Sequence, residues 1–292
     1  MESIALDEIT ACGENCSGCE KRKTGICRGC IEADGCVPEW SGSGRCPVHA
    51  CCRGHFVQFC GLCPEFPCSR LPELVHWNPD IIERQRELAG LFHRRGYPGR
   101  LQAELLLAEA EQRNPGPWGD HSRTAAHCAE KIAALSGMDP EKAYVLGLLH
   151  DIGRRFGKRH LGHVSDGYSY MMSLGYKDAA RICLTHSFNG KRIEEYIGNF
   201  DTDREETDLI RNRLQEAVFD DYDLLVQLCD AVSGSEGVMD IIDRMSDVKK
   251  RYGHYDPVKW EKNLSLKAYF ENKMGKDLYV AVEKGLFSPK GR

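Results

Sequence analysis

The sequence predicts a mainly α-helical protein in which an all-helical bundle follows a small, loop-rich domain that bound metal stabilises. Of the 15 cysteines, 12 lie between residues 12 and 68, in a segment that is also rich in Gly and Pro and lacks a helical period. Beyond residue 80, apolar residues recur at helical spacing almost to the end of the chain. We therefore expect a Cys-rich domain at 1–75, a helical linker at 76–114 and the bundle at 115–292.

The totals exclude several classes of protein. With 292 residues the chain is long enough for two domains, and its net charge of −5 leaves no global basic surface for nucleic acid. No stretch approaches the roughly 20 apolar residues that a membrane span needs. The N-terminal segment MESIALDEITACGENC has neither a basic start nor an apolar core, so a secretory signal is not expected. We expect a cytoplasmic protein with neither a membrane nor a nucleic-acid partner.

Clustered cysteines in the reducing cytoplasm usually bind metal instead of forming disulfides. The spacings CxxxCxxC, CxxC and CxxCxxxxC are typical of metal ligands, and two tetrahedral four-Cys zinc sites would use eight of them. With little apolar content, the segment depends on metal for folding free energy. The expected ligands are Cys12, Cys16, Cys19, Cys27, Cys30, Cys60, Cys63 and Cys68. Spare residues or a third site are Cys36, Cys46, Cys51 and Cys52, with His49 and His55 as possible substitutes; the pairing is open.

The segment FCGLCPEFPCSRL at 59–71 resembles a bacterial and archaeal Cys-rich family of unknown function that is expected to bind zinc. Two alternatives use iron instead. The spacing of Cys12, Cys16 and Cys19 matches that of radical-SAM enzymes, although no βα-barrel pattern follows, and the number of cysteines permits a ferredoxin-like cluster. We favour a structural zinc module that docks a protein partner or covers a cleft of the helical domain that follows.

The first helices are expected at 80–95 and 101–113, with a break at GYPG between them. NPGPWGD at 114–120 is a second break, and Asp120 is expected to cap a helix that runs to residue 136. Asp139-Pro140-Glu141 then begins another helix, because a capping Asp, a Pro at the first position and an acid in the first turn all favour a helix start.

Further helices are expected from the apolar periodicity, and no alternating strand pattern of convincing length occurs after residue 80. Their ranges are 164–174, 177–187, 205–217, 221–233, 236–250 and 257–273.

A His-Asp pair ends the apolar helix AYVLGLLHD. Ala143, Leu146 and His150 share one face of that helix, so His150 points toward the core, and Asp151 follows it directly. Asp230 lies inside LLVQLCDAV, where an isolated charge is heavily penalised. A divalent cation removes that penalty, so we expect a metal site.

Five segments in order resemble the HD superfamily of metal-dependent phosphohydrolases: HSRTAAHCAEKIA, LLHDIGRR, HVSDGYSYMMSLGY, ARICLTHSF and LLVQLCDAVSG. The resemblance covers roughly residues 101–270. It implies that His121, His150, Asp151 and Asp230 bind metal. It also implies a dinuclear site, in which Asp151 uses one oxygen for each metal and His163 and His186 complete the second site.

Two other histidines near this set need a separate assignment. His160 could replace His163 or face the substrate, whereas His127, six residues after His121, lies on another helix face and is not expected to be a ligand. Two departures from the family are visible: Arg154 stands where many members carry Lys, and the Gly-Tyr-Pro signature of the cyclic-di-GMP hydrolases is missing after the histidines.

The mixed imidazole and carboxylate set suits Fe, Mn, Co, Ni or Zn, with one or two ions. The expected reaction is attack of a metal-bound hydroxide on phosphorus, with Asp151 and His150 in the catalytic site. Basic residues that follow the His-Asp pair could clamp phosphate oxygens. These residues are Arg154, Arg155, Lys158 and Arg159.

We therefore expect an HD phosphohydrolase, a phosphomonoesterase or phosphodiesterase, that acts on a nucleotide or another small phosphate ester. The choice of substrate rests on family analogy. Two alternatives are a di-iron HD-fold oxygenase and a non-catalytic metal-binding adaptor or sensor.

Overall fold

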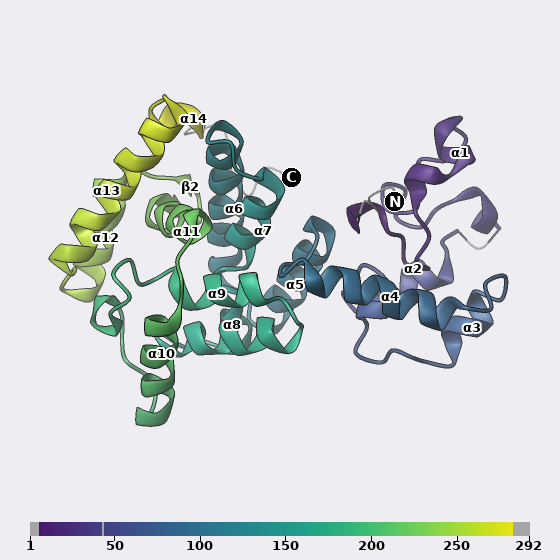
Figure 1. The fold of residues 1–292 in the computed structure, drawn as a ribbon, viewed down its shortest axis with the longest axis horizontal. Helices are drawn as coiled ribbons and strands as arrows, with labels where there is room; N and C mark the ends of the chain where they lie inside the picture. The colour runs from purple at the N-terminus through teal and green to yellow at the C-terminus, as the bar shows by residue number, and fades with distance from the viewer. Residues whose placement is uncertain (1–5, 43, 283–292) are drawn as a thin grey trace. The chain divides into compact units, whose positions relative to one another are not determined.

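The computed structural model describes residues 6–42 and 44–282, and the chain divides into two compact units, 1–109 and 110–292 (Figure 1). The mainly α-helical fold class is confirmed, because helices form most of the chain that the structure describes. Each unit is described by itself.

The helical unit is a bundle in which α6 packs most extensively against α7, and α11 packs against both. Ala129 and Ile132 of α6 meet Leu225, Leu228 and Val232 of α11 in a fully buried cluster. Its helices are α6 (Trp118–Leu135), α7 (Pro140–Leu149), α8 (Gly162–Ser173), α9 (Lys177–Thr185), α10 (Arg204–Glu216), α11 (Asp221–Val232), α12 (Ile241–Tyr252), α13 (Pro257–Met274) and α14 (Leu278–Ala281).

Local sequence signals account for most of these helix starts. The Asp139 side chain accepts hydrogen bonds from the backbone N–H groups of Glu141 and Lys142, with Pro140 at the first helical position, as predicted. Asp220 and Asp223 form a reciprocal capping box at the start of α11. Asp120 was predicted to cap α6, but the helix begins two residues earlier at Trp118, so Asp120 lies in its first turn and contacts Arg123.

Within residues 110–282 of the helical unit, the structure has two short strands that the sequence did not predict. β1 (Ser233–Gly234) pairs antiparallel with β2 (Gly237–Val238), which delays the start of α12 to Ile241 where a helix from 236 was expected. Each strand has two residues, too few to produce a period-2 pattern. The hairpin matters for the site, because the Ser233 carbonyl orients a histidine described below.

The Cys-rich unit is mostly loops and short helices, but it has its own apolar clusters. Val48, Cys52, Val57 and Leu71 are buried together. Its helices are α1 (Glu20–Lys23), α2 (Pro47–Gly54), α3 (Arg70–Leu74), α4 (Ile81–Arg94) and most of α5 (Arg100–Arg113), with 3-10 turns η1 (Leu6–Glu8), η2 (Cys16–Gly18), η3 (Pro38–Trp40) and η4 (Cys60–Leu62). Helix α2 was not predicted from the sequence.

Helix α4, expected to be part of a linker, packs against the Cys-rich segment. Leu88 and Phe92 of α4 are fully buried with Ile9 and Phe59, and the Phe59 and Phe92 rings meet edge to face with centroids 4.9 Å apart. This helix therefore supplies apolar surface that residues 6–75 lack by themselves.

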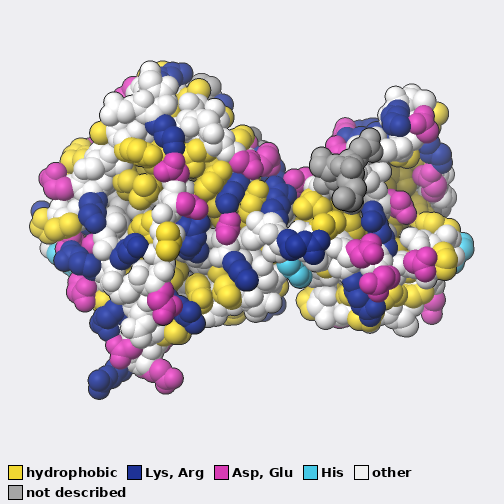
Figure 2. All heavy atoms as spheres, in the orientation of Figure 1, with side chains coloured by type: hydrophobic (Ala, Val, Ile, Leu, Met, Phe, Trp, Pro, Cys, Tyr) yellow, Lys and Arg dark blue, Asp and Glu magenta, His cyan; other side chains and the backbone are white. Residues whose placement is uncertain are grey.

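Basic and acidic side chains intersperse over the visible surface, in keeping with a small net charge (Figure 2). None of the helices described has both the length and the apolar character needed to cross a bilayer.

Candidate metal centre

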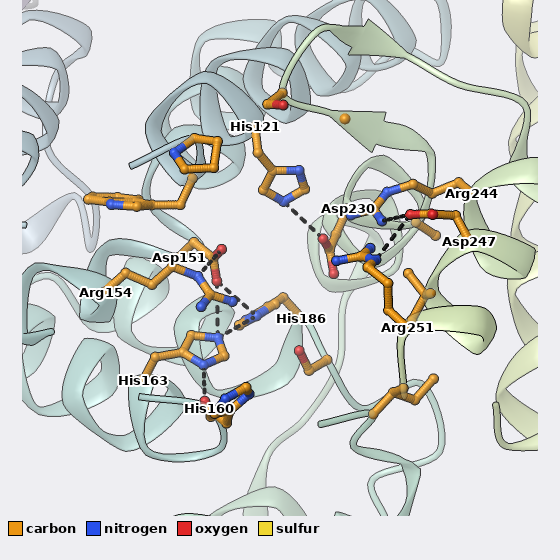
Figure 3. A pocket seen from close by; sticks show the side chains of 18 of the residues that line it. His121, Asp151, Arg154, His160, His163, His186, Asp230, Arg244, Asp247 and Arg251 are labelled. Atoms are coloured by element: carbon orange, nitrogen blue, oxygen red, sulfur yellow. Dashed lines mark hydrogen bonds and ion pairs between the residues drawn. The ribbon is translucent and has the colours of Figure 1, made fainter. Parts of the chain in front are cut away.

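Six of the predicted metal ligands converge in the helical unit, in two groups of three (Figure 3). Within each group, one ligand atom from every residue lies within 4.8 Å of the others. The first group contains His121, His150 and Asp230, and the second contains Asp151, His163 and His186. Among the residues the structure describes, these are the groups with three ligand atoms so close together.

The first group joins α6, α11 and the end of α7. His121 Nε2 lies 3.2 Å from His150 Nε2 and 3.1 Å from Asp230 Oδ1. His150 Nε2 lies 3.9 Å from the same carboxylate oxygen. Three ligand atoms from three separate elements therefore face one point.

The second group joins the segment after α7 to α8 and the end of α9. His163 Nε2 lies 3.3 Å from His186 Nε2, and Asp151 Oδ1 lies 3.0 Å from His163 and 3.6 Å from His186. The two groups adjoin, because the rings of His150 and His186 are 5.1 Å apart between centroids.

The outward ring nitrogen of each imidazole is held by the backbone. His121 Nδ1 donates to Ser233 O at 3.0 Å and His150 Nδ1 to Gly147 O at 2.7 Å. Nδ1 of His186 donates to Cys183 O at 2.9 Å, and Nδ1 of His163 donates to the carbonyl of His160. Because a carbonyl only accepts, each neutral ring carries its proton on Nδ1 and a lone pair on Nε2.

In both groups, then, two Nε2 lone pairs face each other at about van der Waals contact, beside a carboxylate oxygen. Such an arrangement is repulsive unless a proton or a cation lies between the nitrogens. Neutral imidazole and ionised carboxylate are the forms that bind metal. The donor set therefore fits a divalent cation in each group.

The pKa values of the buried members agree with these protonation states. Burial lowers the pKa of His150, and burial together with the nearby His150 lowers the pKa of His186 to about 3. Burial by itself would raise the pKa of Asp230, but the adjacent His121 imidazole lowers it below its usual range. Likewise, Arg154 and His163 outweigh burial and lower the pKa of Asp151.

Asp151 is placed to serve both groups. Its Oδ1 faces His163 and His186, whereas its Oδ2 lies 4.0 Å from His150 Nε2. Oδ2 also accepts a hydrogen bond from Arg154 Nε at 2.5 Å. A carboxylate with its oxygens turned toward two adjacent groups has the geometry of a bridging ligand.

Gly153 allows the turn after the His-Asp pair to pack directly against helix α8. The turn η5 (Ile152–Phe156) carries this glycine against α8, and an added Cβ would lie 2.0 Å from His163 O and 2.5 Å from Gly167 N. Both atoms belong to the backbone and cannot move aside alone. Gly153 therefore permits the close approach of the Asp151 segment to the helix that carries His163.

The two groups open into a cavity of about 910 Å³, a volume typical of sites for small ligands. Arg154, Lys158 and Arg159, three of the four residues predicted to bind phosphate, line it. The guanidinium of Arg159, however, is bound to Asp166 at 2.9 and 3.0 Å and to Glu206 at 2.6 Å. Its Nη1 and Nη2 groups therefore link α8 to α10 through carboxylates of both helices.

Arg155 departs further from its predicted role. It is buried, and its guanidinium lies 3.8 Å from the ring centroid of Tyr170 and 4.9 Å from that of Phe156. This stacking places Arg155 in the packing of η5 against α8 and away from the cavity lining. Sequence proximity to the His-Asp pair could not show which basic side chain turns inward.

Two other histidines near the site, His160 and His127, lie outside both groups. His160 lines the cavity but is not in the second group, where His163 stands, and its ring meets Tyr252 edge to face at 6.3 Å. His127 is outside both groups and packs its ring against Tyr144.

In the Cys-rich unit the thiols approach in pairs. Cys52 Sγ lies 3.6 Å from Cys60 Sγ, close to the roughly 3.8 Å that separates two sulfurs on one tetrahedral zinc with Zn–S bonds of about 2.3 Å. Burial raises the pKa of Cys30, and its neighbours Cys16, Cys12 and Cys46 raise it further.

Two residues left as spares, Cys46 and Cys52, therefore stand beside expected ligands. Cys51 also belongs with them: burial raises its pKa, and the nearby Cys60 and Cys68 add smaller increases. Cys19 and Cys27 instead lie near Lys21: Glu39 raises the pKa of this lysine most, and both thiols raise it further. The spacing in the sequence could not show this, because α2 returns residues 46–52 to the other cysteines.

The fold and the site define a helical domain of a metal-dependent hydrolase type. Residues 118–235 match the family model of the HD domain, so this part of the chain is an HD domain. The match contains all six residues of the two groups. Comparison with curated proteins and with solved structures gave no match.

Sequence reasoning missed the far wall of the cavity. Arg244, Arg251, Tyr252 and Lys259, from α12 and α13, line it beyond the end of the HD match. In the sequence they read as polar or surface positions of amphipathic helices, and no local signal marks them.

Proposed function

We propose that this protein is a metal-dependent phosphohydrolase that acts on a nucleotide or another small phosphate ester. The observation that carries the proposal is the pair of adjoining His/Asp groups that share Asp151 and open into a cavity of about 910 Å³. Membership of the HD family supports the hydrolase class.

His121, His150 and Asp230 would hold one ion, His163 and His186 a second, and Asp151 would bridge them. Fe, Mn, Co, Ni or Zn suits these ligands. Bound divalent ions would supply an acidified water and polarise a phosphoryl oxygen.

The chain's own residues bind and orient the substrate. The backbone carbonyls at Ser233, Gly147 and Cys183 hold the imidazoles in one tautomer, so the ligands need little rearrangement. Arg154 lies against Asp151 at the cavity surface and presents a guanidinium beside the place where a phosphate would lie. Lys158, exposed at the cavity, adds a second positive charge.

The test is to quantify bound metal and to screen phosphate esters with the wild type, Asp151→Ala and a control, Asp208→Ala. Asp208 is half-exposed on α10 and pairs with Arg211, so its loss should change neither metal nor activity. We expect phosphate release with the wild type and the control and none with Asp151→Ala. Equal activity and metal content in all three proteins would overturn the proposal, and Fe(II)-dependent oxygen consumption without phosphate release would favour an oxygenase.

We also propose that the Cys-rich unit binds zinc. The separation of the Cys52 and Cys60 sulfurs, that of two ligands on one ion, supports this proposal. Elemental analysis of protein purified without oxygen should find zinc that Cys52→Ser reduces and Asp151→Ala leaves in place. Visible charge-transfer absorption that depends on the same cysteines would show an iron–sulfur cluster instead.

A further inference from the structure

The cavity above the metal centre extends beyond the HD domain. The family match ends at residue 235, yet α12 and α13 supply one side of the lining (Figure 3). The six residues of the metal groups lie within the part that matches the HD domain, whereas this wall belongs to the rest of the chain. Its chemistry therefore bears on which substrate this protein takes.

Lys259, near the start of α13, is the most informative residue of this wall. It is half-buried, and its Nζ donates to Ser187 O at 2.6 Å. Across the residues that the structure describes, no carboxylate forms an ion pair with it; Asp230, Glu195 and Asp256 act on it only from farther away. A cation held in a cavity without an adjacent anion is costly, and an anionic ligand would complete its coordination.

The position of Lys259 also relates it to the metal centre. Ser187 directly follows the ligand His186, so the hydrogen bond to its carbonyl places the ammonium next to the second group. Lys259 lies on the wall that α13 contributes, and Arg154 lies beside Asp151. A phosphate between them would be held by positive charge from separate elements.

Helix α12 adds an apolar strip beside this charge. Met245, Val248 and Tyr252 line the cavity at helical spacing, so they share one face of α12. Arg244 and Arg251 flank the strip, at 3.9 and 3.1 Å from Asp247, which leaves this helix face with a net positive charge. Such a face fits an organic group that carries a flat ring near a phosphate.

We propose that Lys259 binds the phosphate of the substrate and that the Met245–Val248–Tyr252 face of α12 holds a ring in its organic part. The chain beyond the HD domain thus selects a ring-bearing phosphate ester such as a nucleoside monophosphate. This inference rests on the proposed phosphohydrolase function, but binding can be measured separately from hydrolysis.

The experiment measures the Kd of inorganic phosphate by calorimetry on the manganese-loaded protein. We expect Lys259→Met to raise that Kd about tenfold to a hundredfold, because a charge-assisted hydrogen bond is lost, and Lys259→Arg to restore most of the affinity. Lys262→Met is the matched control, since Lys262 lies on the same helix and donates to Asn189 O at 3.3 Å but is not a lining residue. Manganese content should be equal in all four proteins.

The outcomes separate this inference from the proposed function. Loss of phosphate affinity in Lys259→Met alone supports the role of Lys259, even if no ester is hydrolysed and the proposed function fails. Hydrolysis by the wild type with the same phosphate Kd in Lys259→Met and Lys262→Met overturns the role of Lys259 and leaves the proposed function standing.

A second arm tests the ring-binding face. Tyr252 is 36% exposed, so Tyr252→Ala should fold normally. We expect this variant to raise the Kd of adenosine 5′-monophosphate roughly fivefold or more, as loss of a stacking side chain does, without changing the Kd of inorganic phosphate. Equal affinity of the wild type for adenosine 5′-monophosphate and ribose 5-phosphate would overturn the ring-binding assignment.

Discussion

The two units bring metal-ligating side chains together in different ways. In the helical unit, six ligands from different helices converge within two tight groups, and a buried apolar core lies beneath them. In the Cys-rich unit, thiols meet in pairs, such as Cys52 with Cys60, among small apolar clusters. We therefore expect the first site to be organised by the fold, and the Cys-rich unit to depend on the proposed metal for its fold.

The two units also differ in how their metal-ligating side chains are held. Each imidazole of the two groups is fixed by a backbone carbonyl at Nδ1, so its orientation is set without metal. The thiols of the Cys-rich unit lie largely on loops and 3-10 turns such as η2 and η4. Four predictions test this contrast.

Removal of the shared carboxylate should abolish activity without unfolding the bundle. Asp151→Ala takes away the ligand that faces both groups, so we expect kcat/KM to fall at least about a thousandfold, or roughly 4 kcal/mol. Steady-state kinetics and circular dichroism check this. A large loss of helicity would contradict the view that the fold organises this site without its metal.

Removal of all metal should unfold the Cys-rich unit and spare the helical one. Binding free energy on the order of 10 kcal/mol per structural zinc is folding free energy for such a segment. Hydrogen exchange of the full chain, with and without a strong chelator, should show lost protection in α2 and unchanged protection in α6 and α11. Equal loss in both units would remove the contrast between them.

A side chain at Gly153 should destabilise the helical unit, because there is no room for a Cβ atom. The added Cβ in Gly153→Ala would lie 2.0 Å from His163 O, so the backbone must shift at a cost of about 1–3 kcal/mol. Gly90→Ala in α4 is the matched control, because the nearest atom to its added Cβ is Arg94 Nη1 at 3.5 Å. Chemical denaturation should show a loss for the first and no loss for the second.

Arg159 and Arg154 should differ despite their proximity in the sequence. Arg159→Ala breaks the link between α8 and α10, and we expect a stability loss of only about 1 kcal/mol, since the pairs are partly exposed. Phosphate affinity should stay unchanged in Arg159→Ala and fall in Arg154→Ala. If Arg159→Ala weakens phosphate binding as much, the assignment of Arg159 to helix packing is wrong.

The helical class and most helix boundaries could be predicted from the sequence, and the resemblance of five short segments to the HD superfamily implied the candidate ligands of the helical unit. These features are local: apolar residues at helical spacing, caps such as Asp139, and charges in apolar surroundings such as Asp230. Local signals sufficed there because a helix forms largely from contacts within a few residues of each other.

Which groups face each other depends on the tertiary structure. It turned the two oxygens of Asp151 toward different partners, stacked Arg155 on Tyr170 and brought Lys259 to the cavity, more than 100 residues from His150. It also placed Cys52 beside Cys60 through a helix that the sequence did not predict. Such contacts join residues distant in the chain, so they depend on the packing of whole elements, which no short stretch of sequence encodes.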